Sequence, residues 1–188
     1  MPTLQIIVAS TRPGRVGLAV GQWVHERAVE HGAFDVELID LAEVNLPFLD
    51  EPKHPRLGQY QHQHTKDWSA KVAVGDAFVF VTPEYNHSFN APLKNAIDYL
   101  YAEWQHKPVG FVSYGGLAAG TRAIQALKPV VAVLKMTPVV ESVPIPFVGQ
   151  LIDADGRFQA TDSLNRAAVG MFDELKRLDA ILRPTRSQ

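Results

Sequence analysis

The fold is decided by the stretch Ser10-Thr11-Arg12-Pro13-Gly14-Arg15-Val16-Gly17, which joins an apolar run at Leu4–Val8 to a helical pattern at Gly17–His31. Two hydroxyls, two guanidinium groups and two glycines gather where the free N–H groups of a helix start point outwards. Taken one by one, these residues also suit an ordinary turn with a hydroxyl cap and solvated arginines. The whole cluster at this position favours a phosphate site, because backbone amides, hydroxyls and arginine forks all donate to phosphate oxygens.

Working outward, short β-type runs alternate with helical patterns along the rest of the chain. The β-type runs are Leu4–Val8, Val36–Ile39, Ala77–Val81, Val109–Ser113 and Pro138–Val140. The helical patterns cover Gly17–His31, about Tyr60–Val74, Ala91–Tyr101, Thr121–Lys135 and about Ser163–Leu182. This alternation predicts an α/β fold, a doubly wound sheet of five parallel strands in the order 2-1-3-4-5 with helices on both faces. Ligands of such sheets bind beyond the carboxyl ends of the strands.

Length and composition exclude several classes of protein. The 188 residues suit a single domain, 1–188, and the net charge of −2 without a basic run argues against nucleic-acid binding. The sequence has no cysteine, so redox chemistry would need an organic cofactor. The apolar stretches are too short to cross a membrane and no signal sequence is recognisable, so we expect a cytoplasmic protein.

Two further turns follow the third and fourth β-type runs and are expected at the same sheet edge. The first is Thr82-Pro83-Glu84-Tyr85-Asn86-His87-Ser88, and the second begins Ser113-Tyr114-Gly115-Gly116. Each alone suits a routine connection to a helix. Together they offer exposed amides, a tyrosine ring and glycines that permit close backbone approach to a flat ligand.

The phosphate-loop motif of nucleoside triphosphatases and the glycine fingerprint of dinucleotide-binding domains are both absent from the first turn. Asp40, at the end of the second run, has two interpretations: a ribose ligand, as in dinucleotide-binding domains, or a cap after a strand. The cap is the commoner role. A single terminal phosphate fits the first turn better than a pyrophosphate.

Ser10-Thr11-Arg12 after the first run, with Pro83-Glu84-Tyr85-Asn86 after the third, resembles the NADPH-dependent FMN reductase family, which includes chromate and quinone reductases. Leu93-Lys94-Asn95-Ala96-Ile97-Asp98 and Ser113-Tyr114-Gly115-Gly116 extend the resemblance. Two departures stand out: Ala9 where the family has glycine, and Asn90-Ala91-Pro92 where it often has Pro-Gly.

The resemblance implies a flavodoxin-like fold and a role for each turn. Ser10, Arg12, Arg15 and the amide of Gly17 would hold the FMN phosphate. The second turn would border the isoalloxazine and ribityl chain, and the third would supply backbone near the pyrimidine end. The implied cofactor-binding residues are Ser10, Thr11, Arg12, Arg15, Val16, Gly17, Pro83, Glu84, Tyr85, Asn86, Ser113, Tyr114, Gly115 and Gly116.

The implied function is an FMN-dependent NAD(P)H oxidoreductase that passes hydride from NADPH or NADH to a quinone, azo compound, chromate or free flavin. No side-chain acid, base or metal is required, because the flavin carries the chemistry. The resemblance also implies a homodimer or homotetramer. The alternatives are a flavodoxin-type electron carrier that acts with a protein reductase, and a scaffold that has lost flavin binding.

A few conspicuous side chains receive structural interpretations. Trp23, Trp68 and Trp104 fall in predicted helices and are expected to pack in the core or at an interface. His62 and His64 are two residues apart, a spacing that does not place them on one helix face, so they are read as solvated rather than metal-binding. His87 is expected at the rim of the flavin site, either exposed in the turn or touching a substrate.

Overall fold

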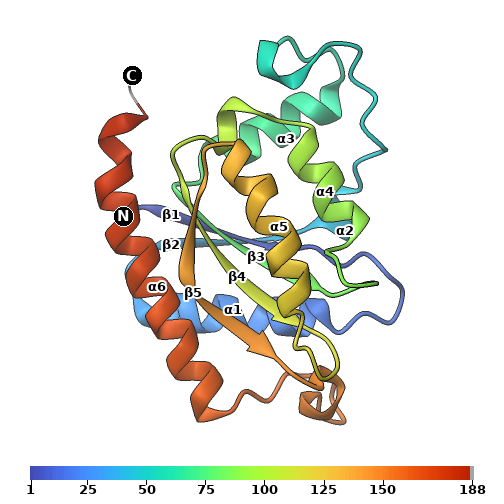
Figure 1. Cartoon of the computed structure of the whole chain (residues 1–188), viewed down its shortest axis with the longest axis vertical. Coiled ribbons are helices and arrows are strands. Elements are labelled where there is room, and N and C mark those ends of the chain that lie inside the picture. Colours follow the sequence, from blue (N-terminus) through green and yellow to red (C-terminus); the bar gives the residue numbers. More distant parts are fainter. Residues whose placement is uncertain (187–188) are drawn as a thin grey trace.

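The computed structural model describes residues 1–186, in which a parallel five-stranded sheet has the order β2-β1-β3-β4-β5 (Figure 1). The strands are β1 Thr3–Val8, β2 Asp35–Asp40, β3 Ala77–Pro83, β4 Pro108–Tyr114 and β5 Thr137–Ile145. The predicted fold class, strand order and two-sided helix cover are confirmed. All seven residues of β3 and all seven of β4 are buried, as expected for central strands covered on both faces.

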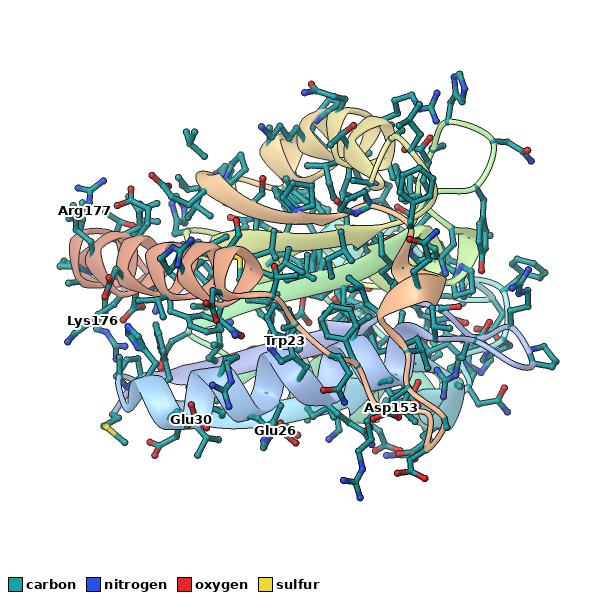
Figure 2. All side chains as sticks on the ribbon, turned by 90° about the horizontal axis from the view of Figure 1, so that it is seen from below. Trp23, Glu26, Glu30, Asp153, Lys176 and Arg177 are labelled. Atoms are coloured by element: carbon teal, nitrogen blue, oxygen red, sulfur yellow. The ribbon has the colours of Figure 1, made fainter. Side chains whose placement is uncertain are left out.

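Helices cover the sheet as two layers. One layer contains α1 Gly17–His31 and α6 Asp162–Leu182, which run side by side in Figure 2; the other contains α2 Leu41–Val44, α3 Gln63–Ala73, α4 Ala91–Asp98 and α5 Thr121–Val133. Trp23 packs in the first layer, where its indole Nε1 donates to Asn165 Oδ1 at 3.0 Å. Trp68 and Trp104 pack in the second. The prediction that the three tryptophans are core residues is confirmed.

Several predicted boundaries are wrong. Strand β5 runs on to Ile145, well past the predicted Val140, because prolines and polar residues that break its apolar pattern are tolerated at a sheet edge. Helix α4 ends at Asp98 instead of Tyr101, and α3 begins at Gln63. Trp104 lies in a short 3₁₀ turn instead of a helix. Other 3₁₀ turns are Pro55–Leu57, Val148–Leu151 and Arg183–Thr185. No helix within residues 1–186 is both long and apolar enough to cross a membrane.

Candidate functional site

The register of the sheet brings the three expected turns to one edge. Val8 pairs with Val81, and Pro83 pairs with Tyr114, so β1, β3 and β4 end side by side. The Ala9 N–H donates to Val81 O at 2.9 Å and so extends the pairing of β1 with β3 up to the first turn. The first two turns touch directly, because Ser10 Oγ lies 3.4 Å from Tyr85 Oη. The predicted convergence of these turns is therefore found.

The space around these turns is divided between two hollows. One, of about 550 Å³, lies between the turns after β3 and β4 and is lined by Glu84, Asn86, His87, Gly115, Gly116, Leu117, Ala118, Gly120 and Arg122. The other, also about 550 Å³, lies between the first turn, α2 and α4, and includes Thr11, Phe48 and Asn95 in its lining. Ser10, Tyr85 and Tyr114 lie where the three turns meet. Pro83 is a buried strand residue.

The first turn leads to a helix start that no side chain caps. Val16 is the residue before α1, and it makes no capping hydrogen bond. The first N–H groups of α1 are therefore available to an anion. Gly14 adopts a φ of +69°, in the left-handed region that favours glycine. Arg12 is exposed, and its side chain makes no hydrogen bond or ion pair within residues 1–186.

Arg15 has a different position from the one that the resemblance implies. Its guanidinium forms a two-pronged ion pair with Asp40 and also donates to Ser10 O, which ties the first turn to the end of β2. Asp40 Oδ1 accepts from the Ala42 N–H at 3.0 Å, so Asp40 caps α2. Burial is the largest single influence on the pKa of Asp40 and opposes its ionisation, but the Arg15 hydrogen bonds, the Ala42 N–H and the charge of Arg15 together outweigh it and hold the pKa of this carboxyl below its usual value. The cap interpretation of Asp40 is confirmed, and Arg12 is left as the unpaired cation of the turn.

A buried hydroxyl beneath α1 has no partner. Tyr114 is 4% exposed, and its Oη makes no hydrogen bond within residues 1–186. Gly17 permits this position, because a Cβ on Gly17 would lie 2.3 Å from Tyr114 Oη. Burial raises the pKa of Tyr114, and the neighbouring Ser10 hydroxyl offsets only part of this effect, so the phenol stays protonated. A buried donor without an acceptor is costly, so its place beside the open start of α1 fits a phosphate ester.

The second turn has a fixed shape. Tyr85 and Ser88 exchange two backbone hydrogen bonds of 2.8 and 3.0 Å, and Asn86 and His87 between them have φ values of +50° and +67°. Tyr85 is partly exposed, with its hydroxyl towards Ser10. This geometry leaves the Tyr85 ring available to border a flat ligand.

Other backbone groups of the second and third turns are already engaged. The Glu84 N–H donates to Tyr114 O, and the Gly115 N–H donates to Ile145 O at 3.3 Å. Ser113 Oγ donates to Ala119 O at 2.9 Å. These contacts use Ser113 and Gly115 to connect β4 with β5 and with the start of α5. The Gly116 carbonyl is also occupied, because it accepts from the Ala119 and Phe147 N–H groups, so the Gly116 N–H is the better candidate to contact a ligand.

Two residues of the site were not predicted from the sequence. Asn90, at the start of α4, does not cap its helix; its Nδ2 donates to Ala9 O at 2.7 Å, while its buried Oδ1 has no partner within residues 1–186. The two positions that depart from the family pattern are thus joined to each other. Arg122, near the start of α5, pairs with the Glu84 carboxylate, which also accepts from the Arg122 backbone N–H. The polar side chain of Asn90 directly before a helix was a signal that could have identified it. No local sequence signal indicates that Arg122 would pair with Glu84, which lies 38 residues away.

The histidines near α3 have local partners. His64 Nε2 lies 2.9 Å from Asp50 Oδ1, and the His62 ring stacks on His64 at 5.2 Å between centroids. The sequence spacing indicated neither contact. The two rings stack because His62 precedes α3 instead of lying on it, and the acidic partner Asp50 comes from the preceding loop. Within residues 1–186, no group of three or more histidine, aspartate or glutamate side chains is placed to hold a metal ion.

Known proteins show what this arrangement belongs to. Residues 2–150 match the family described as NADPH-dependent FMN reductase. An NAD(P)H-dependent FMN reductase of Schizosaccharomyces pombe is 39% identical over 181 residues, which is 93% of this chain and 90% of that protein. An FMN-dependent NADPH-azoreductase of Staphylococcus saprophyticus is 32% identical over 127 residues, 67% of each chain. The flavoenzyme FerB of Paracoccus denitrificans, an NAD(P)H:acceptor oxidoreductase, shares the fold with a TM-score of 0.77 and 20% identity, over 97% of this chain and 99% of FerB. The chain belongs to the NADPH-dependent FMN reductase family.

Proposed function

We propose that this protein is an FMN-dependent NAD(P)H oxidoreductase that reduces small-molecule acceptors. The observation that supports it most is the buried Tyr114 hydroxyl beneath the uncapped start of α1, which has no hydrogen-bond partner within residues 1–186. Arg12, in the turn that leads to α1, is exposed and is not paired with any other side chain of the described residues. When bound, FMN supplies the hydride chemistry between a nicotinamide and the acceptor. Quinones, azo compounds, chromate and free flavin are the acceptors we propose.

The residues of the chain bind and orient the cofactor. Tyr114, Ser10 and the first amides of α1 would hold the phosphate, with Arg12 adding a charge-assisted contact. Tyr85 would border the ring system, and the Gly116 backbone would face its polar edge. Arg15 acts by positioning: it fixes the first turn to Asp40.

An electron carrier of the flavodoxin type is the second candidate. The near-neutral charge and the arginines of the first turn favour the reductase, because flavodoxins are typically strongly acidic and use a hydroxyl-rich phosphate loop without arginines. We also propose that residues 1–188 work as one domain, in the cytoplasm, and as a homodimer or homotetramer.

The decisive experiment is a visible spectrum of the purified protein with FMN, before and after anaerobic addition of NADPH. Bleaching of the flavin bands by the protein and NADPH alone supports the reductase. A flavin that binds but is reduced only with a partner reductase supports the carrier. A protein that stays colourless with added FMN contradicts both. Steady-state rates at varied acceptor should give parallel double-reciprocal lines, since the two substrates are expected to use the same place in turn.

A further inference from the structure

Arg122 stands at the edge of the hollow between the turns after β3 and β4. About half of its side chain is exposed (49%), whereas the Glu84 side chain that it pairs with is 7% exposed. Nη1 of Arg122 lies 2.8 Å from His87 Nε2, and Nη2 makes no hydrogen bond within residues 1–186. Nε and Nη1 of Arg122 are therefore held by Glu84 and His87, and Nη2 is available to donate to a ligand.

His87 determines how much positive charge this edge carries. A guanidinium nitrogen can only donate, so His87 Nε2 must accept and the ring is neutral in this arrangement. Of the residues that line the hollow, only Glu84, His87 and Arg122 have ionisable side chains. Glu84 and Arg122 offset each other. Protonation of His87 adds one positive charge and replaces its bond with Arg122 by repulsion.

The rest of the hollow, beside the place proposed for the flavin ring at Gly116, suits the body of an aromatic molecule. Leu117 is 84% exposed and lines it, together with Ala118 and the glycines of the third turn. An apolar wall beside a guanidinium matches a planar compound that carries an anionic group.

We propose that Arg122 and His87 form an anion-recognition pair, which binds a phosphate, sulfonate or carboxylate carried by the reductant or by the electron acceptor. This proposal rests on the proposed reductase function and adds a substrate class to it. Arg122 Nη2 is the first donor, and protonated His87 adds a second cation. One more charge about 6 Å from the anion in a solvated site strengthens binding on the order of three- to tenfold.

The test compares substrates that differ in one anionic group. NADPH and NADH report on the reductant; 1,2-naphthoquinone-4-sulfonate and 1,2-naphthoquinone report on the acceptor. We expect Arg122→Gln to lower kcat/KM for the more highly charged member of one pair, NADPH or the sulfonate, about tenfold relative to its partner, mainly through KM. The pair that responds identifies the source of the anion. His87→Gln retains a hydrogen-bond acceptor for Arg122 but cannot carry a positive charge, so it should lower the preference by a smaller factor than Arg122→Gln does.

Lys128→Gln is the matched control, because it removes a charge six residues further along α5. An equal loss for both members of both pairs in Arg122→Gln, or a change no larger than in Lys128→Gln, overturns the proposal. An FMN titration of the parent protein distinguishes failure of the Arg122 proposal from failure of the proposed reductase function. If the parent protein binds FMN and oxidises NADPH, but Arg122→Gln does not change the preference for the more highly charged substrate, only the role of Arg122 is contradicted. A parent protein that neither binds FMN nor oxidises NADPH removes the proposed function as well.

Discussion

Arg12 and Arg15 lie three residues apart in one turn, yet the structure predicts opposite consequences for their loss. Arg15 is bound by Asp40, and the two side chains are 16% and 6% exposed. Arg12 is exposed and unpaired within residues 1–186. We therefore expect Arg15→Gln to destabilise the fold and Arg12→Gln to weaken FMN binding.

The magnitudes follow from these environments. Breaking a fully buried ion pair costs about 3–5 kcal/mol, and the partial exposure of Arg15 lowers the expected cost to about 2–3 kcal/mol. For a chain of this length that is a fall in Tm of about 4–12 °C. Loss of the Arg12 contact to a phosphate costs about 1.5–3 kcal/mol, or roughly ten- to over a hundredfold in Kd for FMN. As a surface change, Arg12→Gln should alter stability by less than about 0.5 kcal/mol.

Both properties are measurable on the same preparations. Urea unfolding of the apoprotein, followed by circular dichroism, gives stability, and quenching of FMN fluorescence gives Kd. Asp40→Asn completes a double-mutant cycle, because its side-chain oxygen can still accept from the Ala42 N–H. The coupling energy with Arg15→Gln should exceed about 1 kcal/mol. If Arg15→Gln instead weakens FMN binding as much as Arg12→Gln and leaves stability unchanged, Arg15 is a phosphate ligand and the reasoning is wrong.

Three further predictions concern buried polar groups. Tyr114→Phe should weaken FMN binding roughly two- to tenfold without destabilising the apoprotein. The reason is that the Tyr114 hydroxyl has no partner within residues 1–186 and is expected to pair only with a bound phosphate. An unchanged Kd for FMN would exclude Tyr114 from the site. Asn90→Leu should cost about 1–3 kcal/mol in urea unfolding, because it removes the hydrogen bond that Ala9 O accepts from Asn90; stability equal to the parent's would show that this bond contributes nothing. Burial lowers the pKa of Lys107 from 10.5 to about 8, so protonation in the folded state costs stability, and the free energy of unfolding should rise between pH 8 and 10.5. The rise from this group is at most about 3 kcal/mol, and Lys107→Met should remove it; identical pH profiles of the two proteins would contradict the assignment.

The sequence by itself determined the topology and the place of the site. Runs such as Ala77–Val81 are apolar at every position, which marks central parallel strands, and their alternation with helical patterns leaves few possible orders. The edge at which the ligand binds follows from that order. The sequence alone therefore identifies the turns after β1, β3 and β4 as the place of the ligand. Strand β5 was underestimated, because Pro144 and Glu141 interrupt its apolar pattern without ending its pairing.

The partners of the polar side chains were decided only by the tertiary structure. Arg15 meets Asp40 because β1 and β2 pair in a register that places Val8 opposite Asp40. Asn90 reaches Ala9 across 81 residues, and Arg122 reaches Glu84 across 38. Periodicity reports which face of an element is buried, but it does not encode which distant group comes within hydrogen-bond reach. Which groups meet depends on strand register and on the angles at which turns leave the sheet. These features place Arg15 against Asp40, where it stabilises the fold, and leave Arg12 available to bind a ligand.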